Sequence, residues 1–487
     1  MVLEPKSGLI TDPVCVFDFQ SLYPSLIIGY NMCYSTCLGR LSDPNPVVQL
    51  GTQPGLVRHG KHLGKSIAVC SDVLFAQRSD RVGLIPRICH EILQTRIMVK
   101  KSMKVGNKSP GLLKQLDARQ LSLKLLANVI YGYTTASFSG RMPCAEIADS
   151  IVLTGRQSLE SVMRLAEEMG GEIVYGDTDS LFVKLAGKSV GEAFEFGTRL
   201  VDKVANLHPW PMKLIHEKVY WPCCLVTKKR YVGRAFDTIN SEPRLDAKGI
   251  ETIRRDTCPA VAVTVERILQ AVFKSVESDI CIDPAIILES ACITEFSRLL
   301  KGGLPIKFFI FQNQVRELSQ YKSNLPPAAR VAANAGRGDS VMKGERIAYV
   351  ITNGLLGSKL ADLVMEPKSL IEKKTLNFDY YLTKQVIPAI QRIFGPLGNR
   401  AHSWLSEARN LTRRNASIDQ IKRCLLCQST IASSIFKNAV IPSFCNHCLR
   451  NRETQTIATK LGALRKAEME MSECWKICLH WCWGRCY

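Results

Sequence analysis

The sequence lacks long apolar runs and an export signal. No stretch approaches the roughly 20 apolar residues that a membrane-spanning helix needs. Residues 1–13 include Glu4, Lys6 and Asp12 and no extended apolar core, so they do not resemble a secretory signal. Internal repeats and long low-complexity tracts are also missing. We therefore expect an intracellular globular chain with no membrane partner.

Acidic side chains are too few to balance the basic ones. The 487 residues include 64 Lys and Arg against 44 Asp and Glu, which gives a formal net charge of +20. A globular chain with this excess usually binds a polyanion, most often nucleic acid. The alternative is a basic protein that is merely soluble. The length predicts several domains, and the hydrophobic content of 46% is enough for their cores.

The 19 cysteines are distributed unevenly. In a reducing compartment they are not expected to form a disulfide framework. Eleven lie scattered between Cys15 and Cys292, where single buried thiols are the default. The other eight crowd between Cys424 and Cys486, and this clustering indicates metal binding.

Hydrophobic periodicity and turn residues predict the main elements. We expect a core strand at Val14–Phe17 that ends in Asp18, helices at Leu84–Met103, Leu112 to about Tyr133 and Ala145–Glu168, and β runs at Glu172–Tyr175 and Ser180–Lys184. The first two helices predict an αα-hairpin, and the two β runs predict a β-hairpin with acidic residues at its tip. Farther along, we expect mostly helix at Pro259–Lys301, a connector at Pro326–Gly338, helix at Tyr380–Phe394 and a last domain boundary near Arg409–Asn415.

Three aspartates form a candidate metal site. Asp177 and Asp179 are two apart in the predicted hairpin, which puts their side chains on one face of extended chain. Asp18 ends a separate strand, and the three carboxylates converge if that strand lies beside the hairpin. Phosphoryl transfer needs divalent cations held by such hard oxygen ligands. The alternative for the Gly-Asp-Thr-Asp sequence is a simple turn.

Basic residues recur at helical spacing in the predicted αα-hairpin. Lys124, Asn128 and Tyr131 share one helical face, and Arg96 and Lys100 are four apart on the other helix. A hairpin that presents these cations to one cleft would bind a triphosphate by charge-assisted hydrogen bonds. No Walker-type glycine-rich loop is present to do so instead. The alternative is a solvated basic face.

These motifs together resemble the B-family DNA polymerases. The matching stretches are Asp18–Ser25 (DFQSLYPS), Lys124–Gly132 (KLLANVIYG), Tyr175–Ser180 (YGDTDS), Lys228–Tyr231 (KKRY) and Asp246–Asp256 (DAKGIETIRRD). The resemblance implies an α+β multidomain, right-hand fold, with palm at 1–83 and 141–246, fingers at 84–140, a mainly helical thumb at 247–406 and a cysteine-rich, metal-binding domain at 407–487. It implies a DNA-directed DNA polymerase whose substrates are primer–template DNA and deoxynucleoside triphosphates.

The resemblance also implies roles for individual residues. Asp18, Asp177 and Asp179 would hold two Mg²⁺ ions. The incoming nucleotide would be bound by Ser21, Leu22, Arg96, Lys100, Lys124 and Asn128, with Tyr131 at the nascent base pair. Tyr23 would be the steric gate against a ribose 2′-hydroxyl, the alternative being an ordinary buried aromatic. The DNA duplex would be contacted by Lys228, Lys229, Arg230, Tyr231, Lys248, Arg254 and Arg255.

The cysteine-rich tail divides into two groups. Cys424, Cys427, Cys445 and Cys448 form two C-x2-C pairs, the spacing of a tetrahedral zinc site, with four unrelated buried thiols as the alternative. In the family, a second cysteine module holds a [4Fe-4S] cluster and binds accessory subunits. The candidates here are Cys474, Cys478, Cys482 and Cys486, but their C-x3-C spacing departs from the family pattern. A straight helix could not bring all four to one cluster, so either this segment is not helical or the module is incomplete.

Two stretches resemble the translesion zeta branch of the family rather than the replicative delta branch. They are Asn31–Arg40 (NMCYSTCLGR) and Gly132–Cys144 (GYTTASFSGRMPC). This branch implies DNA damage bypass in the nucleus. It also implies an upstream exonuclease-like domain and a segment that binds a HORMA-domain subunit, and we expect neither in this chain. The open alternatives are a delta-type replicative enzyme, a catalytically inactive polymerase-fold scaffold, and, for the tail alone, a zinc-ribbon nucleic-acid binder.

Overall fold

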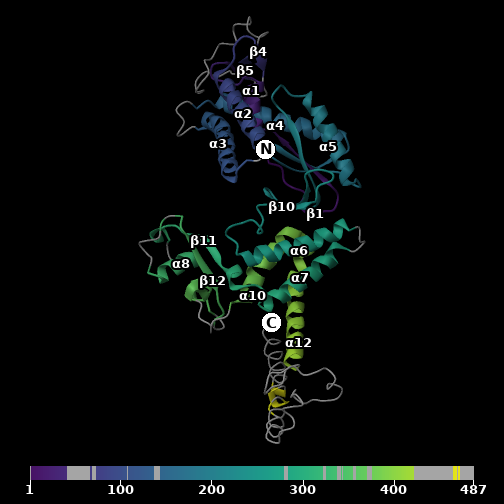
Figure 1. Cartoon of the computed structure of the whole chain (residues 1–487), viewed down its shortest axis with the longest axis vertical. Helices are drawn as coiled ribbons and strands as arrows, with labels where there is room; N and C mark the ends of the chain where they lie inside the picture. The colour runs from purple at the N-terminus through teal and green to yellow at the C-terminus, as the bar shows by residue number, and fades with distance from the viewer. Residues whose placement is uncertain are drawn as a thin grey trace.

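The computed structural model describes residues 2–40, 66–68, 73–106, 108–136, 143–278, 283–321, 325–336, 342, 344–354, 358–369, 376–421, 464, 466–468 and 470–471. These residues mix helix and sheet in two main bodies (Figure 1). The N-terminal body contains a seven-stranded sheet with helices, and the body that follows β10 is richer in helix. No helix among the described residues is long and apolar enough to span a membrane.

The seven-stranded sheet is antiparallel and has the order β10-β9-β8-β2-β7-β6, with β1 also paired to β8. Its strands are β1 (Gly8–Ile10), β2 (Val14–Phe19), β6 (Glu172–Asp177), β7 (Ser180–Lys184), β8 (Leu214–Thr227), β9 (Arg230–Phe236) and β10 (Arg244–Lys248). The predicted strand and β-hairpin are therefore confirmed. The hairpin β6–β7 lies directly beside β2, as convergence of the aspartates requires.

Strand β2 is buried on both faces over Val14–Phe17, which explains the apolar run that precedes Asp18. Cys15, Phe17 and Phe19 point into one core with the helices α1 (Leu22–Gly29), α4 (Ala145–Glu168) and α5 (Val190–Ala205). Val14 and Val16 alternate to the other face, where an aromatic cluster covers them. Because side chains alternate along a strand, Asp18 falls on this second face.

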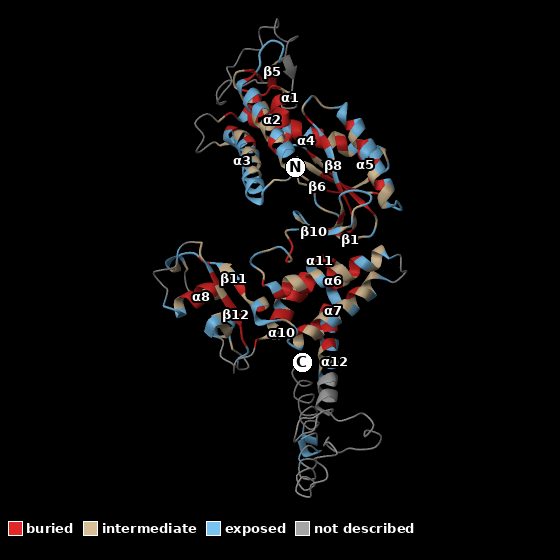
Figure 2. Ribbon diagram, in the orientation of Figure 1, coloured by how far each residue is buried: buried red, intermediate tan, exposed pale blue. Residues whose placement is uncertain are grey.

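Helices α2 (Leu84–Lys104) and α3 (Pro110–Thr135) form the predicted αα-hairpin. Helix α3 begins two residues before the expected start, because Pro110 occupies its first turn and the Ser109 side chain accepts a hydrogen bond from Leu112 N. Along α3 only Ala127 and Thr134 are buried, and the helix is largely pale in Figure 2. Much of the α3 surface, including Lys124 and Asn128, is therefore accessible to a ligand or partner.

The second body packs helices against a small sheet. Its α-helices are α6 (Pro259–Glu277), α7 (Pro284–Leu300), α8 (Pro327–Asn334), α9 (Leu360–Leu363), α10 (Phe378–Tyr380), α11 (Ile387–Phe394) and α12 (Ala401–Ile421). Short 3-10 helices are η3 (Ile306–Phe309), η4 (Leu318–Gln320), η5 (Pro367–Ser369) and η7 (Gly395–Arg400), and η6 (Tyr381–Val386) is a π-helix that joins α10 to α11. Strands β11 (Phe311–Gln314), β12 (Arg346–Ile351) and β13 (Val364–Met365) form a three-stranded sheet. Another three-stranded sheet, in the first body, contains β3 (Cys37–Arg40), β5 (Val73–Ala76) and β4 (Ser66–Ala68).

Two segments of the second body are helical where the sequence indicated a connector or a boundary. The stretch predicted as a connector, Pro326–Gly338, contains helix α8 instead. Its Pro327 fits the first helical turn and its alanines have high helix propensity, so the composition that indicated a linker also fits a helix. Helix α12 runs without a break through residues 406 and 407, where the sequence placed a domain boundary. All eight cysteines of the tail lie outside the described residues.

Candidate active site

The structure places Asp18 beside the acidic hairpin. Asp18 lies near the end of β2 and pairs in register with Ser180 of β7 and Ile215 of β8. The next residue, Phe19, donates its backbone N–H to the carbonyl of Asp179 over 2.9 Å. Strand pairing therefore fixes the position of Asp18 relative to Asp179.

The tip of the hairpin differs from the extended geometry expected for it. Asp177 is the last residue of β6 and pairs with Ser180, so Thr178 and Asp179 form the turn itself. Thr178 has a positive φ of 56°, which reverses the chain within two residues. The prediction that both aspartates project from one face of extended chain is therefore wrong. The turn gives Asp177 and Asp179 different neighbours.

Burial and mutual repulsion raise the carboxylate pKa values in this site. Burial raises the pKa of Asp18 to about 7, assisted by the negative charges of Asp179 and Glu217 and opposed by Lys124 and Lys218. The pKa of Asp179 is also raised, mainly by burial and further by Asp177. A bound cation would relieve both effects. Asp18 and Asp179 are therefore oxygen donors whose ionised forms a nearby positive charge would stabilise.

Asp177 has a positive partner within the chain. Its two carboxylate oxygens accept hydrogen bonds from Lys229 Nζ at 2.9 and 2.8 Å. In the part of the chain that the structure describes, no three His, Cys, Asp or Glu side chains are grouped closely enough to hold a metal ion. The oxygen donors Asp18 and Asp179 suit Mg²⁺, which often takes only one or two protein carboxylates and completes its shell with water and phosphate.

The predicted triphosphate-binding cations lie near one another and near the aspartates. Lys124 on α3 lowers the pKa of both Asp18 and Asp179 through its charge. Burial lowers the pKa of Lys100, and the charges of Arg96 and Lys124 lower it further. Three like charges from two helices are thus held close together. Such a cluster favours a polyanionic ligand that neutralises it.

The helix start after β2 connects these cations to the sheet. Arg96 Nη1 donates to Ser21 Oγ at 3.4 Å. Ser21 has a left-handed backbone conformation, with φ of 53°, and precedes the buried Leu22 at the beginning of α1. The first N–H groups of a helix lack intrahelical acceptors and can bind an anion. Asn128 is exposed on α3, as a ligand-binding side chain would be.

Tyr23 and Tyr131 are in contact. Their ring centroids are 4.5 Å apart, with an angle of 36° between the ring planes. Gly155 on α4 lies behind Tyr23, and a Cβ atom there would be 3.6 Å from Tyr23 Cε1. The negative charge of Asp179 contributes to the raised pKa of Tyr23, after burial and Tyr131. Tyr131, predicted to contact the base pair, and Tyr23, predicted to contact the sugar, therefore form one aromatic surface near Asp179.

The basic run occupies the β8–β9 turn and the start of β9. Lys229 has φ of 62°, and its backbone N–H donates to the Tyr175 hydroxyl at 2.8 Å. The carbonyl oxygen of Lys229 lies so close to Gly249 that a Cβ atom on residue 249 would be 2.4 Å from that oxygen, which explains the glycine. Lys248 pairs in register with Tyr231. The two stretches predicted to contact DNA are therefore neighbours at one edge of the sheet.

Several predicted DNA-binding residues already have acidic partners. Lys228 Nζ lies 2.5 Å from Glu4 Oε1. Arg254 forms two hydrogen bonds with Asp256. Arg255 is exposed, and its carbonyl accepts from Arg346 Nη1 at 3.2 Å. Ion pairs within the chain thus hold the side chains of Lys228 and Arg254 in place in the absence of DNA.

Sequence reasoning missed a buried ionic group under the site. Lys218 Nζ lies 2.7 Å from Asp246 Oδ2, and the Tyr220 hydroxyl donates to the same oxygen at 2.8 Å. Lys218 and the exposed Glu217 both affect the pKa of Asp18. The apolar pattern of β8 reveals a strand but not the partners of its polar residues. Only the register Val16↔Lys218 brings this lysine near Asp18.

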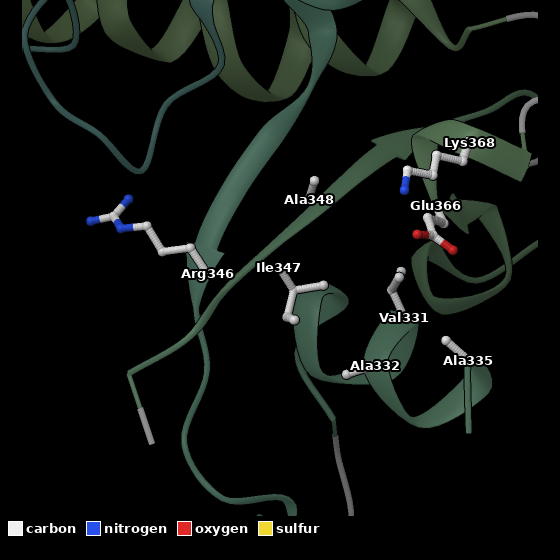
Figure 3. Close-up of a pocket in the computed structure, with 8 residues that line it drawn as sticks. All are labelled: Val331, Ala332, Ala335, Arg346, Ile347, Ala348, Glu366 and Lys368. Atoms are coloured by element: carbon white, nitrogen blue, oxygen red, sulfur yellow. The ribbon is translucent and has the colours of Figure 1, made fainter. Parts of the chain in front are cut away.

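A separate pocket lies in the second body, between α8 and β12 (Figure 3). Its lining is apolar on α8 and β12 and also includes three charged residues, Arg346, Glu366 and Lys368. None of the residues singled out in the sequence lines it. This pocket is therefore distinct from the acidic site.

Comparisons with known proteins agree with the motifs. The zeta catalytic subunit of DNA polymerase from Arabidopsis thaliana is 40% identical over 99% of this chain and 26% of its own length. The Homo sapiens zeta catalytic subunit is 38% identical over 98% of this chain and 16% of its own length. The Plasmodium falciparum delta catalytic subunit is 29% identical over 98% of this chain and 43% of its own length. This chain thus spans about a quarter or less of the two zeta relatives. The sequence model of DNA polymerase family B matches residues 1–397, and the chain belongs to that family.

Proposed function

We propose that this chain is the nucleotidyl-transfer core of a DNA-directed DNA polymerase that works in translesion synthesis. The observation that carries the proposal is the meeting of Asp18 and Asp179 at the end of strand β2, where the charge of Lys124 acts on both carboxylates. The similarity to zeta catalytic subunits supports the translesion assignment, because the delta relative is more distant. The proposed substrates are primer–template DNA and deoxynucleoside triphosphates.

In this proposal the seven-stranded sheet is the palm, the α2–α3 hairpin is the fingers and the second body is the thumb. Asp18 and Asp179 would hold two Mg²⁺ ions, with Asp177 assisting. When bound, the ions supply the positive charge that in-line phosphoryl transfer requires. Because burial raises the pKa of Asp18 to about 7, its carboxyl would hold a cation better as pH rises through neutrality.

The cationic cluster would orient the nucleotide. Arg96, Lys100 and Lys124 would neutralise the triphosphate, and the N–H groups at the start of α1 would bind its oxygens. The aromatic pair Tyr23–Tyr131 would confine the sugar and the base pair. Positioning and charge neutralisation account for most of the catalysis in phosphoryl transfer, so no further acid or base is needed.

The proposal also covers the cysteine-rich tail, the partners of the enzyme and its location in the cell. We propose that the tail cysteines bind zinc, and that the last four bind a [4Fe-4S] cluster where their segment allows it. Accessory polymerase subunits would dock on this cysteine-rich tail, and the enzyme would act in the nucleus.

Primer extension tests the proposed activity. The chain and its Asp179→Asn variant would be given a primed template, deoxynucleotides and Mg²⁺, with DNA binding measured in parallel. We expect extension by the unmodified chain and loss of extension, with retained DNA binding, in the variant. DNA binding without extension by either protein would indicate an inactive scaffold. Templates with an abasic site or a terminal mismatch then separate a zeta-type enzyme, which should extend them, from a delta-type enzyme.

A further inference from the structure

A cavity of about 310 Å³ lies where the sheet body meets the second body. Its cationic lining comes from three separate segments. Arg230 begins β9, Arg392 lies on α11, and Arg254 lies in residues 249–258, the linker between β10 and α6. Glu251 and Asp256 from the linker also line it. Three guanidinium groups against two carboxylates leave a positive surplus in a polar cavity.

The two carboxylates hold two of the arginines in place. Arg392 donates through Nε and Nη2 to Glu251 Oε1, at 3.1 and 2.7 Å. Arg254 donates through Nε and Nη2 to Asp256, at 2.9 and 2.5 Å. In both cases Nη1 has no hydrogen-bond partner among the described residues. Arg230 has no ion-pair partner among them either. The guanidinium groups are thus oriented but retain donors for another acceptor.

We propose that this cavity binds a backbone phosphodiester group of the primer–template, with Arg392 as a DNA contact that none of the sequence motifs includes. The inference rests on the proposed polymerase function. An arginine fork matches the geometry of phosphate oxygens, and its remaining donors can bind phosphate while the carboxylate keeps the side chain in position. Arg230 continues the basic run of Lys228 and Lys229, so a duplex that follows this edge of the sheet would reach the cavity.

The cavity is not part of the proposed triphosphate site. The cations assigned to the triphosphate come from α2 and α3, whereas the cavity is lined by β9, the linker and the segment that contains η6 and α11. An arginine from each body, Arg230 and Arg392, faces the same space. A phosphate bound there would therefore connect the two bodies across the DNA.

The test counts phosphate contacts through the salt dependence of DNA binding. The full chain, Arg392→Gln and Glu251→Gln would be titrated with a primed duplex in EDTA at several salt concentrations. Each lost phosphate contact reduces the magnitude of the slope of log K against log salt by about 0.9. We expect this reduction in Arg392→Gln, with roughly tenfold weaker binding at low salt. Glu251→Gln should keep the slope, because the glutamine amide oxygen can still accept from Arg392 and no cation is removed.

Arg409→Gln is the matched control, because Arg409 also forms a 2.7 Å ion pair, with Asp379, but lies outside the cavity. It should leave the slope unchanged. An unchanged slope in Arg392→Gln, or an equal reduction in Glu251→Gln, would overturn the proposal and leave Arg392 as a structural latch. A raised KM for deoxynucleotides in Arg392→Gln at saturating DNA would overturn it as well and assign the cavity to free nucleotide.

Failure of the polymerase assignment would be visible separately. Equal primer extension by Asp179→Asn and the unmodified chain would overturn the two-metal site, whatever the salt slopes show. A duplex that does not bind the unmodified chain at all would overturn both proposals. The cavity proposal alone would be overturned if the unmodified chain extends primers, Asp179→Asn does not, and Arg392→Gln keeps the salt slope of DNA binding.

Discussion

Lys229 and Asp177 are joined by an ion pair that links the predicted DNA-binding run to the acidic hairpin. The ammonium lies 2.8 Å from one carboxylate oxygen and 2.9 Å from the other, and Asp177 raises the pKa of Lys229. The lysine side chain is largely exposed, with 66% of its surface accessible. An ion pair whose lysine is this exposed contributes little to stability, and the lysine can exchange partners. A divalent cation and a DNA phosphate can therefore compete for its two members.

Lys229→Gln tests this competition. We expect the variant to bind Mn²⁺ or Mg²⁺ more tightly than the unmodified chain, because Asp177 loses its internal cation, and to bind primed DNA more weakly. Spectroscopic titration of Mn²⁺ in the absence of DNA measures the first effect. Lys228→Gln is the control, since Lys228 pairs with Glu4 instead. It should weaken DNA binding without any change in metal affinity; a similar metal effect in both variants would contradict the prediction.

Asp18→Asn should separate stability from activity. The fold raises the pKa of Asp18 from 3.8 to about 7, so ionisation of this carboxyl destabilises the folded state. The penalty is absent below pH 3.8, grows as pH rises to about 7 and is constant above it. In EDTA at pH 8, the variant should be about 1–2 kcal/mol more stable, after allowance for partial exposure, and the gain should shrink toward pH 5.

Thermal or urea unfolding at both pH values measures this difference. Asp80→Asn changes an exposed carboxylate and should show no such gain. The stabilised Asp18→Asn variant should be inactive in primer extension. Lower stability of Asp18→Asn at pH 8 would show that the site does not disfavour the ionised carboxyl.

Tyr23→Ala should relax sugar selection. The Tyr23 ring is held between Tyr131 and the glycine at position 155, so its removal opens space where we propose the ribose lies. We expect the ratio of kcat/KM for deoxynucleotides to that for ribonucleotides to fall by about tenfold or more. Tyr23→Phe retains the ring and should retain most of the discrimination. Equal ratios in the alanine variant and the unmodified chain would remove Tyr23 from sugar recognition.

Asp246→Ala should be strongly destabilising. It removes the 2.7 Å partner of the buried Lys218 ammonium and leaves only the exposed Glu217, 3.2 Å away; breaking a buried ion pair in this way costs about 3–5 kcal/mol. Tyr220→Phe removes only a hydrogen bond to the same carboxylate and should cost about 1–2 kcal/mol. Urea denaturation compares the two. A smaller loss in Asp246→Ala than in Tyr220→Phe would contradict the prediction and mean that Glu217 alone compensates the charge of Lys218.

Metal analysis tests the predicted zinc site in the tail. The purified chain should contain about one zinc ion, and Cys445→Ser should lower the zinc content because a tetrahedral site needs all four ligands. Cys474→Ser belongs to the final cysteine group and should leave zinc unchanged while it lowers any bound iron. Equal zinc in the unmodified chain and Cys445→Ser would exclude these cysteines as ligands.

Local patterns in the sequence were sufficient for much of the first body. Helix α4 has the predicted bounds, and α2 and the β6–β7 hairpin differ by only a few residues at their ends. Strong periodicity and clear turn residues determine such elements. The small sheet of the second body was missed, because β11 and β12 are short and their pairing depends on residues distant in sequence.

The candidate site was predictable in residue identity but not in its contacts. Motifs singled out Asp18, Asp179 and Lys124, which the structure brings near one another. They could not reveal that Asp179 lies in a turn, nor that Lys229 binds Asp177. Arg392 carries no motif at all. Its partner Glu251 is far away in sequence, and only the packing of α11 against the sheet body brings the two together.

The central position of β2 has a consequence for how the chain folds. Asp18 pairs with Ser180 on one side and Ile215 on the other, and the α2–α3 hairpin lies between them in sequence. During synthesis, β2 must therefore wait until β7 and β8 have left the ribosome, whereas the helical hairpin can form from local contacts. High contact order of this kind slows folding and leaves an apolar strand without its neighbours. Nascent chains that stall before residue 180 should accordingly need chaperones and should have no acidic site, because they lack β7.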